Sequence, residues 1–207
     1  MLATVTVGTL MSRERHFILR ERTLQKDSAT DVLTGVLNRR GFDQIMDQRM
    51  AEDALGQRSF SLLIVDADHF KAVNDTHGHQ TGDEVLQMLA KALTASLRQE
   101  DVAARLGGEE FGVILHTAHR DEAACVAEKI RARIAGEGIE ANGKIVRVTV
   151  SIGVASSSDC EATARALFET ADRALYRAKQ GGRNRVVASV LRSRLTQGVA
   201  YTAALGA

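Results

Sequence analysis

The sequence has few of the residues that mark disulfide-stabilised or zinc-binding proteins. Its 207 residues include two cysteines, Cys125 and Cys160, which stand far apart in the chain. One distant pair cannot form a disulfide framework, and neither cysteine has a neighbour at the spacing of metal ligands. We therefore expect the protein to work in a reducing, cytoplasmic environment.

A strong excess of charge and a long apolar run are also missing. Lysine and arginine number 27 and aspartate and glutamate 26, so the net charge of +1 gives no reason to expect a nucleic-acid polymer or an anionic membrane as partner. No segment reaches the roughly 20 apolar residues that span a bilayer. Residues 2–11 are nevertheless apolar, and Arg13 and Arg15 follow them. Two interpretations stay open: an amphipathic helix, or the inner end of a membrane helix, with a membrane or sensor module N-terminal to this chain.

The chain divides into three regions. Residues 1–30 carry Leu10, Phe17 and Leu24 at a spacing of seven, which predicts a helical linker or signalling helix that pairs two chains. Residues 31–188 contain the patterns of one domain of ordinary size. Residues 189–207 have no clear period, and we expect a C-terminal tail that is partly disordered.

Apolar periodicity predicts the helices and strands of the domain. Helices are expected from Arg39 to Leu55, from near Gly82 through Leu97, around Ala123 to Ile134, and after a capping box at Ser158 to Glu161. Strands are expected at Phe60 to Ala67, Val102 to Leu106, Phe111 to Leu115, Val146 to Ile152 and near Val186. This order predicts an α+β, ferredoxin-like fold, in which helices pack on one face of an antiparallel sheet.

The hairpin between two of these strands carries the strongest chemical signal. Gly107 and Gly108 are followed directly by Glu109 and Glu110, which predicts a tight turn with paired carboxylates at its tip. Carboxylates beside backbone without side chains suit a hard cation and a polyphosphate. A solvated turn is the alternative for this motif taken alone.

A second acidic cluster follows the buried strand. Asp66 and Asp68 stand at its end, where a carboxylate is costly unless it is paired or binds a metal. The spacing also fits the first and third positions of an EF-hand loop. Lys71 stands where that loop needs glycine and His77 where it needs glutamate, which excludes the EF-hand.

Two further motifs have ordinary structural explanations when taken alone. Gly82 and Asp83 fit the start of a helix. Lys179 and Arg183 flank two glycines and fit the end of a helix.

Taken together, the motifs resemble the GGDEF family of diguanylate cyclases. The resemblance covers about residues 31–188 and rests on motifs that stand in the family's order and spacing. They are Asp31-x-Leu-Thr-Gly-x-Leu-Asn-Arg-Arg40, Asp66-x-Asp68-x-Phe70-Lys71-x-x-Asn74-Asp75, Gly78-His79-x-x-Gly82-Asp83, Arg105-x-Gly-Gly-Glu-Glu-Phe111 and Ala171-Asp-x-Ala-Leu-Tyr-x-Ala-Lys179-x-x-Gly-Arg183-Asn184.

The resemblance implies a nucleotidyl-cyclase fold and an enzyme that condenses two GTP into cyclic di-GMP. It implies two Mg²⁺, or Mn²⁺ in their place, in each half-site. The implied roles are metal binding by Asp66, Glu109 and the Ala67 carbonyl, and metal binding or deprotonation of the 3′-hydroxyl by Glu110. Guanine would be bound by Asn74 and Asp83. The β- and γ-phosphates would be held by the backbone at Phe70 and Lys71 and by the side chains of Lys179 and Arg183. The missing side chains at Gly107 and Gly108 would let GTP approach the hairpin.

The resemblance also implies a homodimer and a feedback site. One hairpin holds one GTP while the reaction joins two, so two domains must face each other. Arg98 and Asp101 match the family's RxxD site, where the product cyclic di-GMP binds and inhibits. Two other functions stay open: a degenerate domain that binds GTP or cyclic di-GMP without turnover, and a dimerisation domain.

Overall fold

The computed structural model describes residues 29–56, 59–117, 119–141, 143–159 and 163–189. The predicted stripe of Leu10, Phe17 and Leu24 and nearly all of the predicted C-terminal tail lie outside these residues. In chain order the elements are β1 (Leu37–Asn38), α2 (Arg39–Ala54), β2 (Ser61–Ala67), α3 (Phe70–His77), α4 (His79–Thr94), β3 (Val102–Gly107), β4 (Glu110–Leu115), α5 (Arg120–Gly136), β5 (Ile139–Ala141), β6 (Lys144–Val146), β7 (Val150–Ser156), a 3-10 turn (Ser157–Asp159), α6 (Ala164–Gln180) and β8 (Val186–Ala188).

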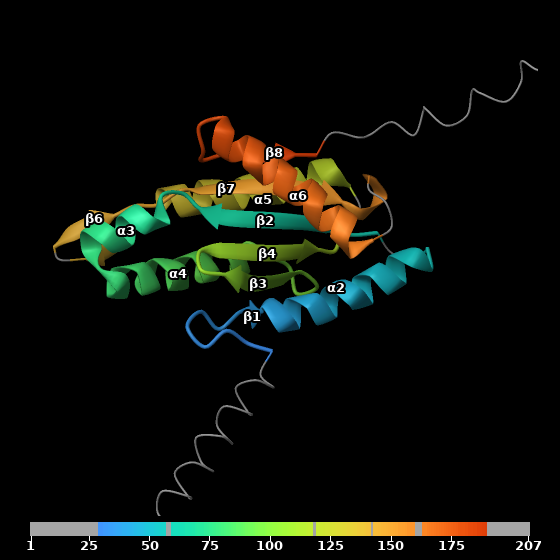
Figure 1. Ribbon diagram of the computed structural model, residues 1–207, viewed down its shortest axis with the longest axis horizontal. Helices are drawn as coiled ribbons and strands as arrows, with labels where there is room; N and C mark the ends of the chain where they lie inside the picture. The colour runs from blue at the N-terminus through green and yellow to red at the C-terminus, as the bar shows by residue number, and fades with distance from the viewer. Residues whose placement is uncertain (1–28, 57–58, 118, 142, 160–162, 190–207) are drawn as a thin grey trace, which may run out of the picture.

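A six-stranded sheet in the order β1-β3-β4-β2-β7-β8 forms the centre of the domain (Figure 1). Its four inner strands, β3, β4, β2 and β7, are antiparallel and have the ferredoxin-like order. The short edge strands β1 and β8 pair in parallel with β3 and β7, so the sheet as a whole is mixed. The predicted α+β class is confirmed.

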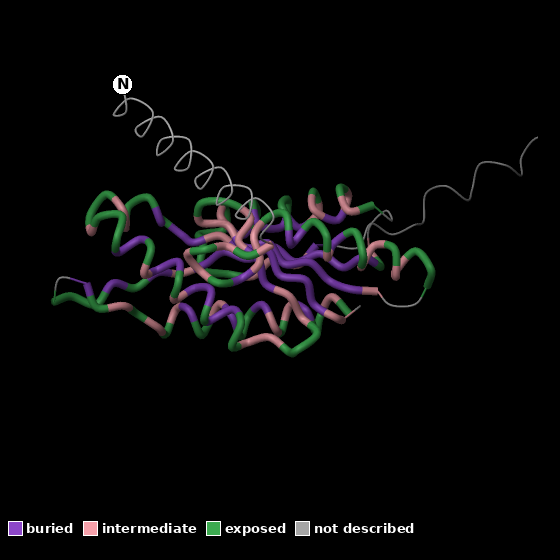
Figure 2. Tube along the Cα trace, turned by 90° about the horizontal axis from the view of Figure 1, so that it is seen from below, coloured by how far each residue is buried: buried purple, intermediate pink, exposed green. Residues whose placement is uncertain are grey.

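Helices cover both faces of the sheet, not one face as the ferredoxin-like comparison predicted. Alternation along β2 sends Leu63 and Val65 into a core beneath α4 and α5, while Leu62 and Ile64 join a second core beneath α2 and α6. Figure 2 shows the buried strands in the middle, with the exposed residues on the outer sides of the helices. Because β2 is buried on both faces, the residues from Leu62 to Val65 are all apolar, without the alternation of a half-exposed strand.

Two glycines beside Ile64 let helices approach the sheet closely. Gly112 on β4 and Gly153 on β7 are both register partners of Ile64. A β-carbon on Gly112 would press into the ring of Phe42 from α2. A β-carbon on Gly153 would overlap backbone atoms of Ala171 and Leu175 in α6. The glycine on β7 therefore fixes how closely α6 lies on the sheet.

The structure corrects three predicted boundaries. The leucine-faced helix begins at His79 rather than near Gly82, and the short helix α3 precedes it. Residues 146–152 do not form one strand, because Val146 ends β6 in a separate two-stranded sheet and Val150 begins β7. Thr163, not the predicted capping box, caps α6 by accepting a hydrogen bond from the Ala166 N–H.

Within the described residues, no helix is both long enough and apolar enough to span a membrane.

The close contact at Gly153 gives a first prediction. We expect Gly153→Ala to destabilise the domain by about 3 kcal/mol, because the added methyl group meets backbone rather than a movable side chain. A loss of that size lowers the melting temperature by roughly 6–12 °C in a domain of this length. Thermal unfolding followed by circular dichroism measures it.

Gly136→Ala is the matched control, because Gly136 ends α5 with nothing within 4 Å of an added β-carbon. We expect this variant to be as stable as the wild type or slightly more stable. Equal melting temperatures for both variants would contradict the proposed contact of α6 with β7.

Candidate active site

The predicted carboxylates converge at one end of the sheet, where β2 ends and the β3–β4 hairpin turns (Figure 1). Asp66 on β2 and Glu110 on β4 are direct register partners across the antiparallel ladder. The Ala67 N–H donates to the Glu109 carbonyl at 3.3 Å, so Glu109 also lies beside the end of β2. Asp66, Glu109 and Glu110 therefore form one acidic cluster, although Asp66 lies more than forty positions before the two glutamates in the sequence.

Cations from the end of α6 balance this cluster. Lys179 Nζ lies 2.9 Å from Asp66 Oδ2, and the two side chains are 35% and 14% exposed. The positive charge of Arg183, in the loop after α6, also acts on Asp66. The structure thus brings Lys179 and Arg183 to the carboxylates, where both can meet an anionic ligand.

Burial and mutual repulsion disturb the ionisation of the acidic cluster. Burial raises the pKa of Asp66, while its hydrogen bond and ion pair with Lys179 oppose the rise. Burial also raises the pKa of Glu109, and the charge of Asp66 adds to it. The pKa of Glu110 is raised by burial and then by the charges of Asp66 and Asp172. All three carboxyl groups would ionise more readily beside an added cation.

The donors in this cluster suit a hard divalent cation. Carboxylate oxygens of Asp66, Glu109 and Glu110 and the backbone carbonyl of Ala67 are the ligand type that Mg²⁺ and Mn²⁺ prefer. In the part of the chain that the structure describes, no three Asp, Glu, His or Cys side chains are already gathered as a metal site. The ion pair between Lys179 and Asp66 is one physical reason, because it holds a carboxylate that a metal would otherwise bind. The residue types fit the metal, and the charge repulsion supplies a reason to bind it.

Arg105 holds the hairpin tip. Its Nε and Nη2 donate to the Gly108 carbonyl at 3.0 and 2.8 Å, and its Nη1 lies 3.4 Å from Asp31 Oδ1. Asp31 also accepts from the backbone and side chain of Thr34. Burial would raise the pKa of Asp31, but these hydrogen bonds and the Arg105 charge outweigh it and lower the pKa. Residues 31–34, at the N-terminal end of the domain, therefore help to hold the hairpin through the contact of Asp31 with Arg105.

The hairpin glycines leave open space. Neither Gly107 nor Gly108 has a positive φ, and an added β-carbon at either position would meet nothing within 4 Å. Packing within the chain therefore does not require glycine at these two positions. A ligand that lies against the hairpin backbone does provide a reason.

The remaining predicted substrate residues lie on α3 and α4. The amide oxygen of Asn74 is buried without a hydrogen-bond partner, and it lies where a β-carbon on Gly82 would be. Asp83 follows Gly82 and is exposed. The contact at Gly82 thus places the predicted base-binding pair on two neighbouring helices.

Phe70 and Lys71 form the first turn of α3, directly after β2. His69 precedes them with a left-handed φ of 58° and provides no side-chain cap. The first N–H groups of a helix have no partner within the helix, and they favour anions such as phosphate. The ammonium of Lys71 pairs with Asp75 on the exposed surface, where such a pair contributes little.

The predicted feedback residues lie at the other end of β3. Arg98 and Asp101 do not end α4, which stops at Thr94, but form a turn before β3. Asp101 Oδ2 accepts from the Arg98 N–H and Oδ1 from the His116 N–H, both at 2.9 Å. The β3 strand separates this turn from the hairpin glycines, a span of roughly 20 Å for a strand of this length. In this turn the Asp101 carboxylate already has a structural role, whereas the Arg98 side chain is exposed.

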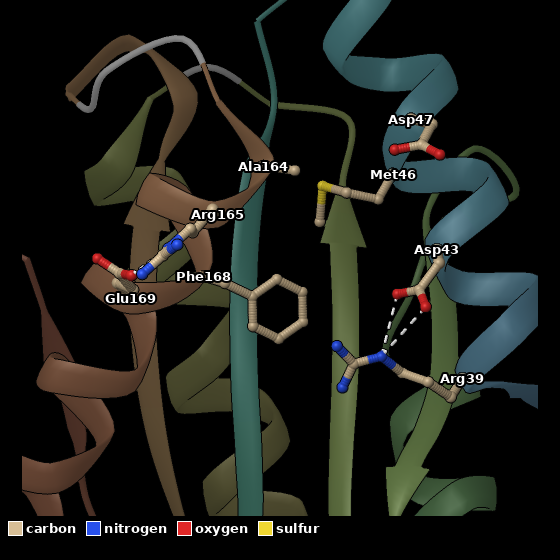
Figure 3. Close-up of a pocket in the computed structure, with 8 residues that line it drawn as sticks. All are labelled: Arg39, Asp43, Met46, Asp47, Ala164, Arg165, Phe168 and Glu169. Carbon is tan, nitrogen blue, oxygen red and sulfur yellow. Dashed lines mark hydrogen bonds and ion pairs between the residues drawn. The ribbon is translucent and has the colours of Figure 1, made fainter.

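A hollow of ≈ 360 Å³ lies elsewhere, between α2 and α6 (Figure 3). Arg39 stacks 5.1 Å above the Phe168 ring and binds Asp43 there, and Arg165 pairs with Glu169. The lining of this hollow has two arginines, both paired with acids, and a third acid in Asp47, and it contains no hairpin glycines that would admit a phosphate to the backbone.

The α+β domain thus combines an acidic hairpin, a cationic loop and a helix N-terminus, which are the groups that suit a divalent cation and a phosphate. The sequence model described as "Diguanylate cyclase, GGDEF domain" matches residues 28–185. The chain belongs to this family.

Curated relatives support this assignment. Diguanylate cyclase A of Treponema denticola is 41% identical over 165 residues, which are 78% of this chain and 44% of the relative. The response regulator PleD of Caulobacter vibrioides is 41% identical over 162 residues, 77% of this chain and 36% of the relative. The chain thus spans less than half the length of these relatives.

Solved structures agree in fold. The GGDEF domain of DgcB from Caulobacter crescentus, solved in complex with c-di-GMP, superposes with a TM-score of 0.73 at 38% identity. The match covers 78% of this chain and 96% of that chain. It confirms the predicted cyclase-like fold.

The raised pKa of Glu110 gives a prediction about stability. A raised pKa means that the folded state holds the proton more tightly than the unfolded chain, so stability falls as pH rises from about 4.3, the ordinary glutamate value, through the folded pKa. Glu110→Gln lacks this ionisation. We expect its melting temperature to exceed that of the wild type near neutral pH without divalent metal, and the difference to vanish below about pH 4.

Glu128→Gln is the control with the opposite sign. The hydrogen bond from Arg131 lowers the pKa of Glu128, so its contribution to stability is present above the unfolded pKa and is lost in acid. This variant should melt below the wild type near neutral pH. A Glu110→Gln variant that also melts lower would contradict the assigned charge repulsion.

Proposed function

We propose that this domain is a diguanylate cyclase, which condenses two GTP into cyclic di-GMP and releases two pyrophosphates. The observation that carries the proposal is the pairing of Asp66 with Glu110 across β2 and β4, with Lys179 at 2.9 Å from Asp66. The relatives named diguanylate cyclase support it. Since GTP is an intracellular nucleotide, the reaction would take place in the cytoplasm.

Each half-reaction joins a 3′-oxygen to an α-phosphorus and breaks that phosphorus's bond to the leaving pyrophosphate. Bound Mg²⁺ or Mn²⁺ would supply Lewis acidity for both oxygens. Asp66, Glu109 and the Ala67 carbonyl would hold the metal. Glu110, whose pKa burial raises, would bind metal as well or accept the proton of the 3′-hydroxyl.

The cationic loop and the α3 N-terminus would bind the leaving group. Lys179 and Arg183 offer positive charge beside the carboxylates, and the N–H groups of Phe70 and Lys71 offer a helix start. The open space at Gly107 and Gly108 would let the α-phosphate reach the hairpin backbone.

Asn74 and Asp83 would select guanine. A carboxylate at Asp83 accepts from guanine N1–H and from the 2-amino group, whereas adenine offers an acceptor at N1. The Asn74 amide oxygen is buried, and the NH₂ at the other end of the amide suits the O6 or N7 acceptor of guanine. Adenine would leave polar groups unpaired, which discriminates strongly.

Two copies of the domain would face each other during the reaction. One acidic hairpin would hold one GTP, and the 3′-hydroxyl that attacks it belongs to the GTP of the other copy. A homodimer with two-fold symmetry brings the two half-sites together.

Incubation with GTP and Mg²⁺, followed by chromatography for cyclic di-GMP, tests this function. We expect Glu110→Gln to bind GTP but to turn over at least about 10²-fold more slowly, because it removes a group that acts on the reacting oxygens. Binding of GTP by the wild type without product would favour the alternative of a degenerate binding domain. Near-normal turnover in Glu110→Gln would contradict its assigned role.

Product inhibition through Arg98 and Asp101 is the regulatory part of the proposal. The guanidinium of Arg98 can donate to guanine or phosphate acceptors. Because β3 separates this turn from the hairpin, bound cyclic di-GMP need not displace GTP, and it would link domains with their half-sites apart.

We expect Arg98→Ala to raise the inhibitory concentration of cyclic di-GMP by about 10-fold or more while the initial rate changes little. Asp101→Ala is a poorer test, because it also removes the hydrogen bonds that the Asp101 carboxylate accepts from the N–H groups of Arg98 and His116. Lys91→Ala, an exposed cation in the last turn of α4, is the control. Progress curves that slow identically in wild type and Arg98→Ala would remove the feedback assignment.

A further inference from the structure

The loop that carries Arg183 has an unusual backbone. Gly182, Arg183 and Asn184 have successive positive φ values of 111°, 62° and 43°. A left-handed backbone is strained for a residue other than glycine, although asparagine tolerates it better than arginine does. Such residues persist only where the surrounding structure holds them, and they cluster at ligand sites.

Two side chains hold this loop at Asn184. Its backbone N–H donates to Asp68 Oδ2 at 3.0 Å, and its side-chain oxygen accepts from Arg131 Nη1 at 2.7 Å. Arg131 is held in turn by its ion pair with Glu128 on α5. Asn184 is thus fixed from the sheet on one side and from α5 on the other.

Asp68 is the buried member of this arrangement, with 5% of its surface exposed. Its carboxylate also accepts from the hydroxyls of Thr149 and Ser151, each at 2.7 Å, and its N–H donates to the Thr149 carbonyl at 2.8 Å. A buried carboxylate is costly unless hydrogen bonds satisfy it, and these three donors do so. Asp68 therefore joins the end of β2, the start of β7 and the loop after α6.

We propose that Asp68 is a positioning residue, which holds the loop of residues 181–185 so that Arg183 faces the pyrophosphate end of GTP. This inference rests on the proposed function. Asp68 acts through Asn184 and Arg183 and does not touch the substrate. Asp68 lies two residues after Asp66. The segment from Asp66 to Asp68 would therefore position both the carboxylate that binds the metal and, through Asn184, the guanidinium of Arg183.

Arg183 needs this support more than Lys179 does. Lys179 belongs to α6, whose buried face packs on the sheet, and it reaches Asp66 directly. Arg183 lies beyond the helix, in a loop with a strained backbone. Removal of Asp68 should therefore cancel the contribution of Arg183 and leave that of Lys179 in place.

Two substitutions at position 68 separate geometry from charge. Asp68→Ala removes all three acceptor contacts. Asp68→Asn can keep them, because its NH₂ can donate to the Ser151 hydroxyl, while its oxygen accepts from Thr149 and from the Asn184 N–H. We expect Asp68→Asn to retain most of the activity.

The decisive experiment is a double-mutant cycle in kcat/KM for cyclic di-GMP formation. Asp68→Ala should lower kcat/KM by about 10–100-fold, the usual effect of losing a support for a site residue. In an Arg183→Ala background the same change should cost less than about 2-fold, since both remove one function. In a Lys179→Ala background its full effect should remain. Equal losses in both backgrounds would overturn the proposal.

A control separates this effect from lost stability. Ser157→Ala breaks a buried hydrogen bond from the Phe60 N–H at the other end of β2. It should lower the melting temperature without changing kcat/KM. If Asp68→Ala does not fold, Thr149→Val, which removes one of the three contacts, takes its place in the cycle and should show a smaller loss with the same pattern.

Two readouts do not depend on turnover. The Asn184 amide should lose protection from hydrogen exchange in Asp68→Ala and keep it in Asp68→Asn. The ratio of GTP to GMP affinity should fall in Asp68→Ala, because GMP lacks the phosphates that Arg183 would hold. A wild type that does not bind GTP would refute the proposed function, whereas unchanged exchange and an unchanged ratio would refute only the role of Asp68.

Discussion

The register between β2 and β4 is the constraint on which the site depends. It sets Asp66 opposite Glu110, and directly opposed like charges weaken an antiparallel pair. The sheet tolerates this because four buried apolar residues, Leu62 to Val65, precede Asp66 on β2 and hold the strand in place. A slip of β2 by one residue would turn Asp66 to the opposite face from Glu110 and would exchange Leu62 and Ile64 with Leu63 and Val65 between the two cores. The hydrophobic pattern therefore holds the acids together against their repulsion.

The positions of the cations Lys179 and Arg183 depend on how α6 and the loop after it pack against the sheet. Lys179 can reach Asp66 because α6 lies close to β7, and the glycine contact at Gly153 permits that distance. Arg183 reaches the cluster from a loop that Asp68 and Arg131 hold through Asn184. The acidic side of the site is thus built by strand pairing, and the cationic side is built by helix packing.

Much of the core was predictable because its helices and strands have apolar patterns that can be recognised within a short stretch of sequence. The apolar run of β2 and the buried stripe of α5 (Ala123, Ala127, Ile130, Ile134) follow from periodicity, and all their apolar residues are buried. Helix α3 was missed because Phe70 is its only buried residue and a left-handed His69 starts it. The single strand expected at Val146 to Ile152 was wrong because alternation cannot show that residues 147–149 leave one sheet before the next begins.

The sequence predicted which residue types make up the site, but it did not predict the hydrogen bonds and ion pairs that hold those residues in place. Carboxylates beside glycines indicate a cation and a phosphate from the sequence alone. The links from Arg105 to Asp31 and from Asp68 to Asn184 join positions 74 and 116 residues apart, so no local pattern could reveal them. Only the fold brings such distant pairs into contact.

The glycines of this domain are constrained for two separate reasons, with different consequences for how the sequence can change over evolution. At Gly153 any side chain would push α6 from the sheet, so selection for a folded chain alone keeps this position as glycine. At Gly107 and Gly108 the chain itself has room for a side chain. A lineage that no longer needs a ligand at the hairpin would be free to lose those two glycines and keep the fold, and it would still retain Gly153.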